Sequence, residues 1–138
     1  MVLVDSSVWI ELFRRDGDLL TKIAMESLLE EGQATYCGIV KLEVLGGAQG
    51  KERVVIANLF SLIPYLSQKE LVWEKAVNLQ WASKAKGLSV PWSDALIATL
   101  AHLNQFRVYA RDKHFVALAE AGFITLYEPG PGGAYRAK

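Results

Sequence analysis

The chain has 138 residues with 15 basic and 15 acidic side chains, so its formal net charge is zero. Hydrophobic residues make up 51% of the sequence and charged residues 22%, which excludes intrinsic disorder and a nucleic-acid binder that relies on excess positive charge. The single cysteine excludes an internal disulfide and a zinc cluster of cysteines, no uncharged apolar run approaches the roughly 18 residues of a membrane span, and the N-terminus lacks the pattern of a secretory leader.

The first 37 residues predict two strands and two helices. Residues 1–4 form an apolar run that is too short for a helix, which favours a buried strand. A helix is expected over residues 6–15, because either of the two serines at its start can cap it. Residues 19–31 repeat apolar side chains at helical spacing, and residues 34–37 are expected to form a second short strand.

The middle of the chain is predicted to be largely helical. A short helix is expected over residues 39–45, where a pair of glycines ends it, and another over residues 52–62. Pro64 restricts the run at residues 63–65 to the edge or the end of a sheet, because proline donates no backbone hydrogen bond. The longest predicted helix follows over residues 70–86.

The last third of the chain returns to an alternation of strands and helices. Ser93 is expected to cap a helix over residues 94–105, and a strand at 108–110, a helix at 113–121 and a last strand at 124–126 follow. Strands that alternate with helices predict a parallel sheet covered on both faces. The expected fold is therefore α/β, a three-layer α/β/α domain with a mainly parallel central sheet.

We expect a single domain over residues 1–128, followed by a tail. Proline and glycine are concentrated in residues 129–138, where they cannot sustain a helix or a central strand. This segment is therefore predicted to be an extended C-terminal tail.

Acidic residues stand close to the carboxyl ends of the predicted strands. Asp5 ends the first strand, Asp112 follows the strand at 108–110, and Asp94 lies in the first turn of its helix. Ligands of such sheets bind outside the carboxyl ends of the strands, so these three carboxylates are expected at one edge. Glu43, in the helix after the second strand, joins them if its helix leans over that edge.

Each carboxylate also has a purely structural explanation. Asp5, Asp94 and Asp112 stand where the N-terminus of a helix favours negative charge, so each can be a helix cap. Glu43 can be a solvent-exposed side chain, although on the helical wheel it falls on the apolar side of its helix. A carboxylate in that position needs a partner, a hydrogen bond or a metal.

As a set, the four carboxylates predict a metal site. Without matching cations they would repel one another, and some would be protonated in the absence of a counter-ion. Hard divalent cations prefer oxygen ligands and relieve that repulsion, so Mg²⁺ is the expected cofactor, with Mn²⁺ as a substitute. A carboxylate-bound Mg²⁺ that keeps several waters suits the chemistry of phosphodiesters.

Four short motifs resemble those of the PIN-domain ribonucleases, most closely the VapC-type toxins of prokaryotic toxin–antitoxin pairs. They are VDSSVW around Asp5, KLEVLGG around Glu43, WSDALIATLA around Asp94 and ARDKHF around Asp112. The resemblance covers nearly the whole chain and is carried by the order, spacing and predicted context of the motifs. One departure is Ala110, which stands where the family often has the hydroxyl of a threonine or serine.

The resemblance implies a metal-dependent endoribonuclease. Its catalytic and metal-binding residues would be Asp5, Glu43, Asp94 and Asp112, and Ser7 would support the site by hydrogen bonding, unless it is a plain helix cap. Hydrolysis by a water that the metal activates would leave a 5′-phosphate and a 3′-hydroxyl. The expected partners are an RNA substrate, such as tRNA or another structured RNA, a cognate antitoxin protein and a second copy of the chain in a homodimer. No membrane partner is expected, and the expected location is the cytoplasm.

Several other residues have less specific interpretations. Arg14, Arg111 and Lys113 are candidates for phosphate contacts near the acidic edge, although Arg14 also suits the C-terminus of its helix. His102 is expected to pack or to lie at an interface. His114 lies near Asp112 and could touch substrate, but the favoured interpretation is an exposed histidine at the start of a helix. The four tryptophans are expected in the core or at an interface rather than stacked on bases.

Two other functions compete with the nuclease. A receiver-like phosphoacceptor domain also clusters carboxylates around Mg²⁺, but it needs paired acidic residues after the first strand, where Ser6 and Ser7 follow Asp5. A catalytically silent interaction module would use the acidic residues only as helix caps. Metal-dependent RNA cleavage, compared between the wild type and Asp5→Asn, distinguishes the three functions.

Overall fold

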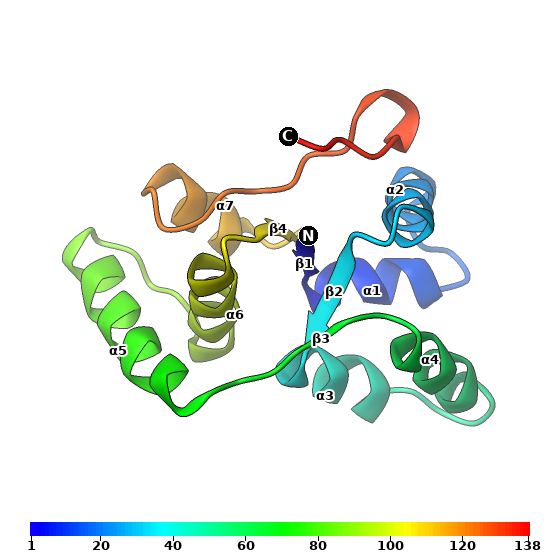
Figure 1. Cartoon of the computed structure of the whole chain (residues 1–138), viewed down its shortest axis with the longest axis horizontal. Coiled ribbons are helices and arrows are strands. Elements are labelled where there is room, and N and C mark those ends of the chain that lie inside the picture. Colours follow the sequence, from blue (N-terminus) through cyan, green and yellow to red (C-terminus); the bar gives the residue numbers. More distant parts are fainter.

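A parallel sheet of four short strands runs through the middle of the protein (Figure 1), in a computed structural model that describes residues 1–138. The strands, in chain order, are β1 (Val2–Val4), β2 (Ala34–Cys37), β3 (Tyr65–Leu66) and β4 (Arg107–Tyr109). Their order across the sheet is β3-β2-β1-β4. Val2 pairs with Ala34 on one side and with Arg107 on the other, so the first strand of the chain lies inside the sheet.

Seven α-helices cover the two faces of the sheet. They are α1 (Ser6–Phe13), α2 (Leu19–Glu30), α3 (Gly38–Gly46), α4 (Glu52–Ser61), α5 (Glu70–Ala85), α6 (Trp92–Asn104) and α7 (Lys113–Glu120). Helices α1 to α4 lie on one side of the sheet and α5 to α7 on the other (Figure 1). This arrangement confirms the predicted three-layer α/β/α fold. None of the helices combines the length and the apolar composition needed to cross a membrane.

The strand order explains why the helices divide between the two faces. The chain first moves outward from β1 through β2 to β3, and then returns past β1 to form β4. Because crossovers between parallel strands are right-handed, a reversal of direction moves the following helices to the opposite face. The chain therefore leaves the carboxyl ends of β1 and β4 toward different faces, which opens a crevice between these two strands.

The elements that border this crevice are deeply buried. All three residues of β1 have no exposed surface, and the Trp9 indole on α1 lies beneath them and donates a hydrogen bond to the carbonyl oxygen of Val4 over 3.2 Å. Helix α6 is buried almost continuously from Asp94 to Ala101, because it packs against α5, α7 and β4. Rigid packing on both sides therefore fixes the side chains that point into the crevice.

Three local predictions from the sequence differ from the structure. Ser93 does not cap α6: the helix begins at Trp92, two residues before the predicted start, with Pro91 in the cap position, because the ring of proline already holds the backbone angle of a helix start. The expected strand at 124–126 is reduced to a single bridge between Val108 and Leu126, held by two hydrogen bonds to the backbone of Val108. The predicted edge strand at 63–65 is displaced by one or two residues, to Tyr65–Leu66.

The C-terminal residues return along the domain and are seated on α2. A short 3₁₀ turn (Pro131–Gly133) lies against α2, and the segment runs past it in Figure 1. The backbone N–H of Tyr135 donates to the hydroxyl of Ser27 over 2.8 Å, and the ring of Tyr135 stacks on Tyr127. The expected extended tail thus contains a turn and a defined docking position.

Gly133→Ala is expected to destabilise the protein more than Gly132→Ala. Both glycines have positive φ, so alanine adds backbone strain of about 1 kcal/mol at either position. Only at Gly133 would the new Cβ meet a neighbour, 2.9 Å from Cγ2 of Ile23 on α2, whereas nothing lies within 4 Å at Gly132. Thermal unfolding should show a decrease of several degrees more for Gly133→Ala. Equal decreases would contradict the seating of the tail on α2.

Candidate metal centre

Asp5 and Asp112 lie at the carboxyl ends of the adjacent strands β1 and β4. Asp5 directly follows β1, and its backbone N–H donates to the carbonyl oxygen of Tyr109, the last residue of β4, over 2.9 Å. Asp112 follows β4 by three residues and begins α7. The crevice at this switch in topology therefore receives one carboxylate from each strand.

Both of these carboxylates cap helices, but capping occupies only one oxygen of each. The Oδ2 atom of Asp5 accepts hydrogen bonds from the backbone N–H and the hydroxyl of Ser7, at 3.1 and 2.6 Å. The Oδ1 atom of Asp112 accepts from the backbone N–H of His114 at 2.8 Å. The second oxygen of each carboxylate has no hydrogen bond within the protein. The cap explanation is therefore correct for these two residues and still leaves a free ligand atom on each.

Asp94 lies in the first turn of α6 and caps nothing. Its side chain is buried and makes no hydrogen bond to the backbone, so the cap explanation fails for this residue. Burial, followed by the charges of Asp112 and Asp5, raises the pKa of Asp94 from 3.8 to about 6. The negative charge of ionised Asp94 is therefore unfavourable in this position unless a cation lies nearby.

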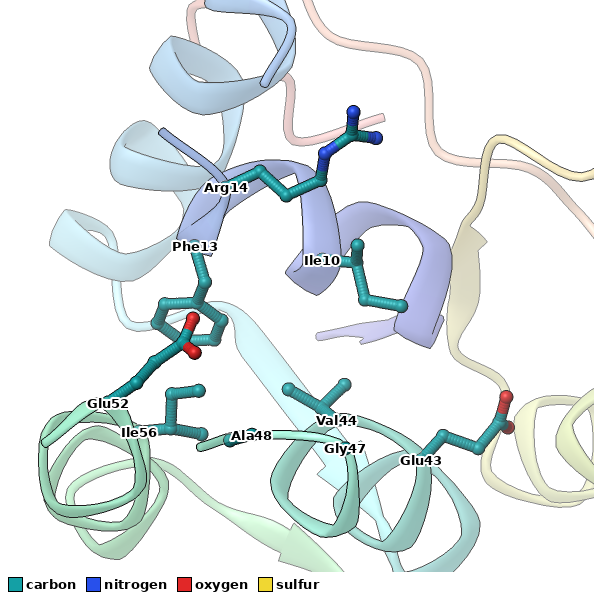
Figure 2. Close-up of a pocket in the computed structure, with 9 residues that line it drawn as sticks. All are labelled: Ile10, Phe13, Arg14, Glu43, Val44, Gly47, Ala48, Glu52 and Ile56. Atoms are coloured by element: carbon teal, nitrogen blue, oxygen red, sulfur yellow. The ribbon is translucent and has the colours of Figure 1, made fainter. Parts of the chain in front are cut away.

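Glu43 reaches the same crevice from α3. The residue as a whole is exposed, but its carboxyl end turns toward α6 at one end of the cavity in Figure 2. Burial of that end and the nearby charge of Asp5 raise the pKa of Glu43, and the hydroxyl of Ser6 opposes the rise. Its charge also raises the pKa of Asp94. The carboxyl end of Glu43 beside α6 in Figure 2 is the position expected if α3 leans over the edge of the sheet.

The hydroxyl of Ser7 joins the two ends of the crevice. It donates to Asp5 and accepts the backbone N–H of Arg111 over 3.0 Å. Arg111 directly precedes Asp112, so this one hydroxyl connects the loop after β4 to the carboxylate after β1. Ala110 offers no hydroxyl of its own, and Ser7 supplies the link between the two segments.

His114 belongs to the crevice, and its interpretation as an exposed histidine at a helix start is wrong. Its Nδ1 atom lies 2.8 Å from Oδ1 of Asp112 and 3.3 Å from Oδ2 of Asp94, and its side chain is 32% exposed. Since Asp112 caps α7, the residue two positions later lies in the first turn and faces the same edge. That spacing after an acidic residue at a strand end was the signal available in the sequence. His102, in contrast, lies on the exposed side of α6 near its C-terminus.

No lysine or arginine pairs with any of the four acidic residues. The guanidinium of Arg111 instead contacts Asp18, at 3.2 Å, and the hydroxyl of Thr21, at 2.6 Å, at the start of α2. Arg14 pairs with two acidic side chains of its own segment. Lys113 is exposed and has no ion pair, so it is the least committed of the three predicted phosphate contacts.

The donor atoms of this crevice fit a divalent cation. One ligand atom each of Asp94, Asp112 and His114 lies within 4.8 Å of the other two, and the charges of Asp5 and Glu43 act on the same group. The negative charge has no lysine or arginine partner, and the Nδ1 atom of His114 is buried without a hydrogen bond. Oxygen-rich donor sets with uncompensated charge are those that Mg²⁺ and Mn²⁺ occupy.

Without divalent cations, the free energy of unfolding is expected to fall as the pH rises from about 4 to about 6. The pKa of Asp94 is higher in the folded protein than in the unfolded chain, so the folded protein binds more protons in this window and loses stability as they leave. The loss from Asp94 is at most about 3 kcal/mol. Urea unfolding in a chelator, between pH 4 and 8, should show a smaller decrease for Asp94→Asn. Parallel curves for the two proteins would contradict the raised pKa.

Comparisons with known proteins place this geometry in a family. Residues 2–121 match the family model described as the PIN domain. The VapC ribonuclease Mb1587 of Mycobacterium bovis is 28% identical over 123 residues, which are 86% of this chain and 92% of that protein. A toxin–antitoxin complex from Klebsiella pneumoniae shares the fold, with a TM-score of 0.73 at 21% identity over 91% of this chain and 96% of that one. VapC20 of Mycobacterium tuberculosis, described as a sarcin-ricin loop cleaving toxin, has a TM-score of 0.67 at 20% identity over 91% and 98%.

Proposed function

The chain belongs to the PIN-domain family, and on that premise we propose that it is a metal-dependent endoribonuclease and the toxin of a toxin–antitoxin pair. This membership confirms the resemblance that the four motifs indicated. The observation that carries the proposal is the group of four carboxylates, without a lysine or arginine partner, at the carboxyl edge of the sheet in a chain of this family. The relatives named as ribonucleases support the choice of RNA as substrate.

In this proposal, Asp5, Asp94 and Asp112 hold Mg²⁺ or Mn²⁺ together with Glu43. Asp5 and Asp112 offer the oxygens that helix capping leaves free, and Asp94 is held in place by the buried α6. When bound, the cation supplies Lewis-acid stabilisation of the phosphodiester and an activated water. Ser7 orients Asp5 by accepting one and donating another hydrogen bond, and Lys113 is placed to neutralise a phosphate of the RNA.

The two competing functions account for less of the geometry. A silent module would need every acidic residue to be a cap, and Asp94 caps nothing. A receiver-like domain would need a second acidic residue beside Asp5, where Ser7 instead donates a hydrogen bond to it. Neither alternative explains a buried carboxyl that faces two others and a histidine.

RNA cleavage by the purified chain tests the proposal. An end-labelled structured RNA is incubated with the protein and Mg²⁺ or Mn²⁺, and the ends of the products are identified. We expect a 5′-phosphate and a 3′-hydroxyl from the wild type, and no cleavage from Asp5→Asn. Products with a 2′,3′-cyclic phosphate would show attack by the ribose hydroxyl and contradict hydrolysis, and no cleavage of any RNA would favour the silent module. Sequencing of RNA ends after expression in cells identifies the target.

The cavity of Figure 2 is the proposed binding site for the antitoxin. It measures about 240 Å³, lies between α1, α3 and α4, and reaches Glu43 at the edge of the metal centre. An apolar segment of the antitoxin would fill it and bring a basic side chain to the carboxylates. Ile56, at the wall of the cavity, and Phe60 on the same helix are only 2% exposed and belong to the core. Co-expression with the protein encoded beside it should suppress RNA cleavage, and unchanged cleavage by a stable complex would exclude inhibition at this site.

Helix α5 is the proposed surface for a homodimer. Trp73, Val77 and Trp81 are exposed at intervals of four residues, so they form one apolar stripe on this helix. The tryptophans are expected in the core or at an interface. Only Trp9 lies in the core, so an interface is the remaining predicted role for the other three. Sedimentation of the wild type should give a dimer and Trp81→Glu a monomer of 15.3 kDa. A monomeric wild type would refute the dimer.

A cytoplasmic location, where the protein would meet RNA and an antitoxin, is part of the same proposal.

A further inference from the structure

His114 is the one side chain of the metal centre that is not a carboxylate or a hydroxyl. It lies in the first turn of α7, and its Nδ1 atom is 2.8 Å from Asp112 and 3.3 Å from Asp94. These two carboxylates and the imidazole nitrogen form the closest group of ligand atoms in the crevice. The imidazole therefore stands among the proposed ligands rather than behind them.

The Nδ1 atom has no hydrogen bond, although it is buried and close to two carboxylates. The Oδ1 atom of Asp112 already accepts the backbone N–H of His114, so the ring nitrogen meets this oxygen outside the direction of a good hydrogen bond. Buried polar atoms normally have a hydrogen-bond partner, so a buried nitrogen without one needs an explanation. A cation bound between the carboxylates would use it.

We propose that His114 is a nitrogen ligand of the cation at this site, and that the site therefore prefers a transition metal such as Mn²⁺ to Mg²⁺. The proposal rests on the proposed metal-dependent function and goes beyond its four acidic ligands. Imidazole nitrogen suits first-row transition metals, whereas Mg²⁺ favours an octahedron of oxygen atoms. Replacing one oxygen donor by Nδ1 therefore shifts affinity toward Mn²⁺.

The alternative role for His114 is that of a positively charged partner for the carboxylates. An imidazolium in that role would direct its N–H at an oxygen of Asp94 or Asp112, and neither contact has the geometry of a hydrogen bond. The orientation of the ring thus favours coordination over a charged hydrogen bond.

Electron paramagnetic resonance of bound Mn²⁺ tests the proposal without relying on catalysis. Mn²⁺ alone is added to the full chain, and pulsed spectra are examined for coupling to an imidazole ¹⁴N nucleus. The wild type should show this coupling, and His114→Asn, which keeps an oxygen near the position of Nδ1, should bind Mn²⁺ without it. His102→Asn is the matched control, because this exposed histidine lies near the far end of α6, and it should retain the coupling.

Calorimetric titration with Mn²⁺ and with Mg²⁺ gives the second readout. The preference for Mn²⁺ over Mg²⁺ should fall about tenfold in His114→Asn and remain unchanged in His102→Asn. The role of His114 would be overturned if Mn²⁺ bound to the wild type shows no nitrogen coupling, or if His114→Asn prefers Mn²⁺ over Mg²⁺ as strongly as the wild type does. Either result would leave the proposed nuclease intact. A wild type that binds neither ion at millimolar concentration would overturn the metal-dependent function itself, and this proposal with it.

Discussion

Asp94→Asn is expected to reduce RNA cleavage at least about a hundredfold while the domain stays folded. Outer-shell partners of metal ligands already contribute about 10–100-fold to affinity or activity, so loss of a carboxylate in the metal centre should cost no less. Asparagine keeps the size of the side chain but removes the charge that attracts the cation. Since Asp94 caps no helix, and since its ionised form is disfavoured by burial, the fold does not depend on its charge.

Asp18→Asn is the matched control for this experiment. Asp18 caps α2 by accepting hydrogen bonds from the backbone and the hydroxyl of Thr21, and it pairs with Arg111. These contacts lower the pKa of Asp18. Its ionised form therefore stabilises the folded protein at every pH above the ordinary pKa of an aspartate. Asp18→Asn should therefore lower the unfolding temperature and retain cleavage, the reverse of Asp94→Asn. A stable, fully active Asp94→Asn protein would remove this residue from the metal centre.

Removal of divalent cations is expected to abolish cleavage and to destabilise the folded protein. Without a cation the carboxylates of Asp5, Asp94 and Asp112 repel one another, because burial and the charges of its neighbours disfavour the ionised form of Asp94. A ligand at a hundred times its dissociation constant stabilises the folded state by about 2.7 kcal/mol, which corresponds to a rise of several degrees in the unfolding temperature of a domain of this size. The rise should be larger at pH 8 than at pH 5, because protons compete with the cation for Asp94 at the lower pH.

Thermal unfolding with a chelator, and after addition of excess Mg²⁺ or Mn²⁺, measures this effect. The same titration with Asp94→Asn should show a much smaller rise, since one of the proposed ligands has lost its charge. Cleavage that persists in the chelator at the rate of the untreated protein would contradict a metal-dependent reaction.

The edge of the sheet and three of its carboxylates could be located from the sequence because their signals are local. Short apolar runs at β1, β2 and β4 indicate where the strands end. Asp5 stands directly after β1, and Asp112 follows β4 by three residues. The alternation of strands and helices predicts that those strand ends meet at one edge of the sheet, and this prediction does not require the packing of the side chains. The same argument reached Glu43 only conditionally, because the direction of α3 depends on how it packs against α1.

What escaped prediction depends on contacts between distant segments. The spacing of ARDKHF places His114 close to Asp112, but the approach of His114 to Asp94, twenty residues earlier in the chain, depends on how α7 packs against α6. The seating of the tail depends on a glycine that fits against Ile23, and composition alone indicated an extended segment. Ser93 does not cap α6 because a second start signal, Pro91, stands two residues earlier and the helix begins there.

The position of β4 beside β1 has a consequence for the cell that translates this chain. Strand β1 leaves the ribosome first, but one of its two edges is paired only after β4, the last strand, has been synthesised. Asp94 and Asp112 are likewise synthesised long after Asp5 and Glu43. A nascent chain that ends before residue 112 holds only part of the acidic centre. The nuclease proposed here therefore has no complete acidic centre until residue 112 has been added to the nascent chain and β4 has paired with β1.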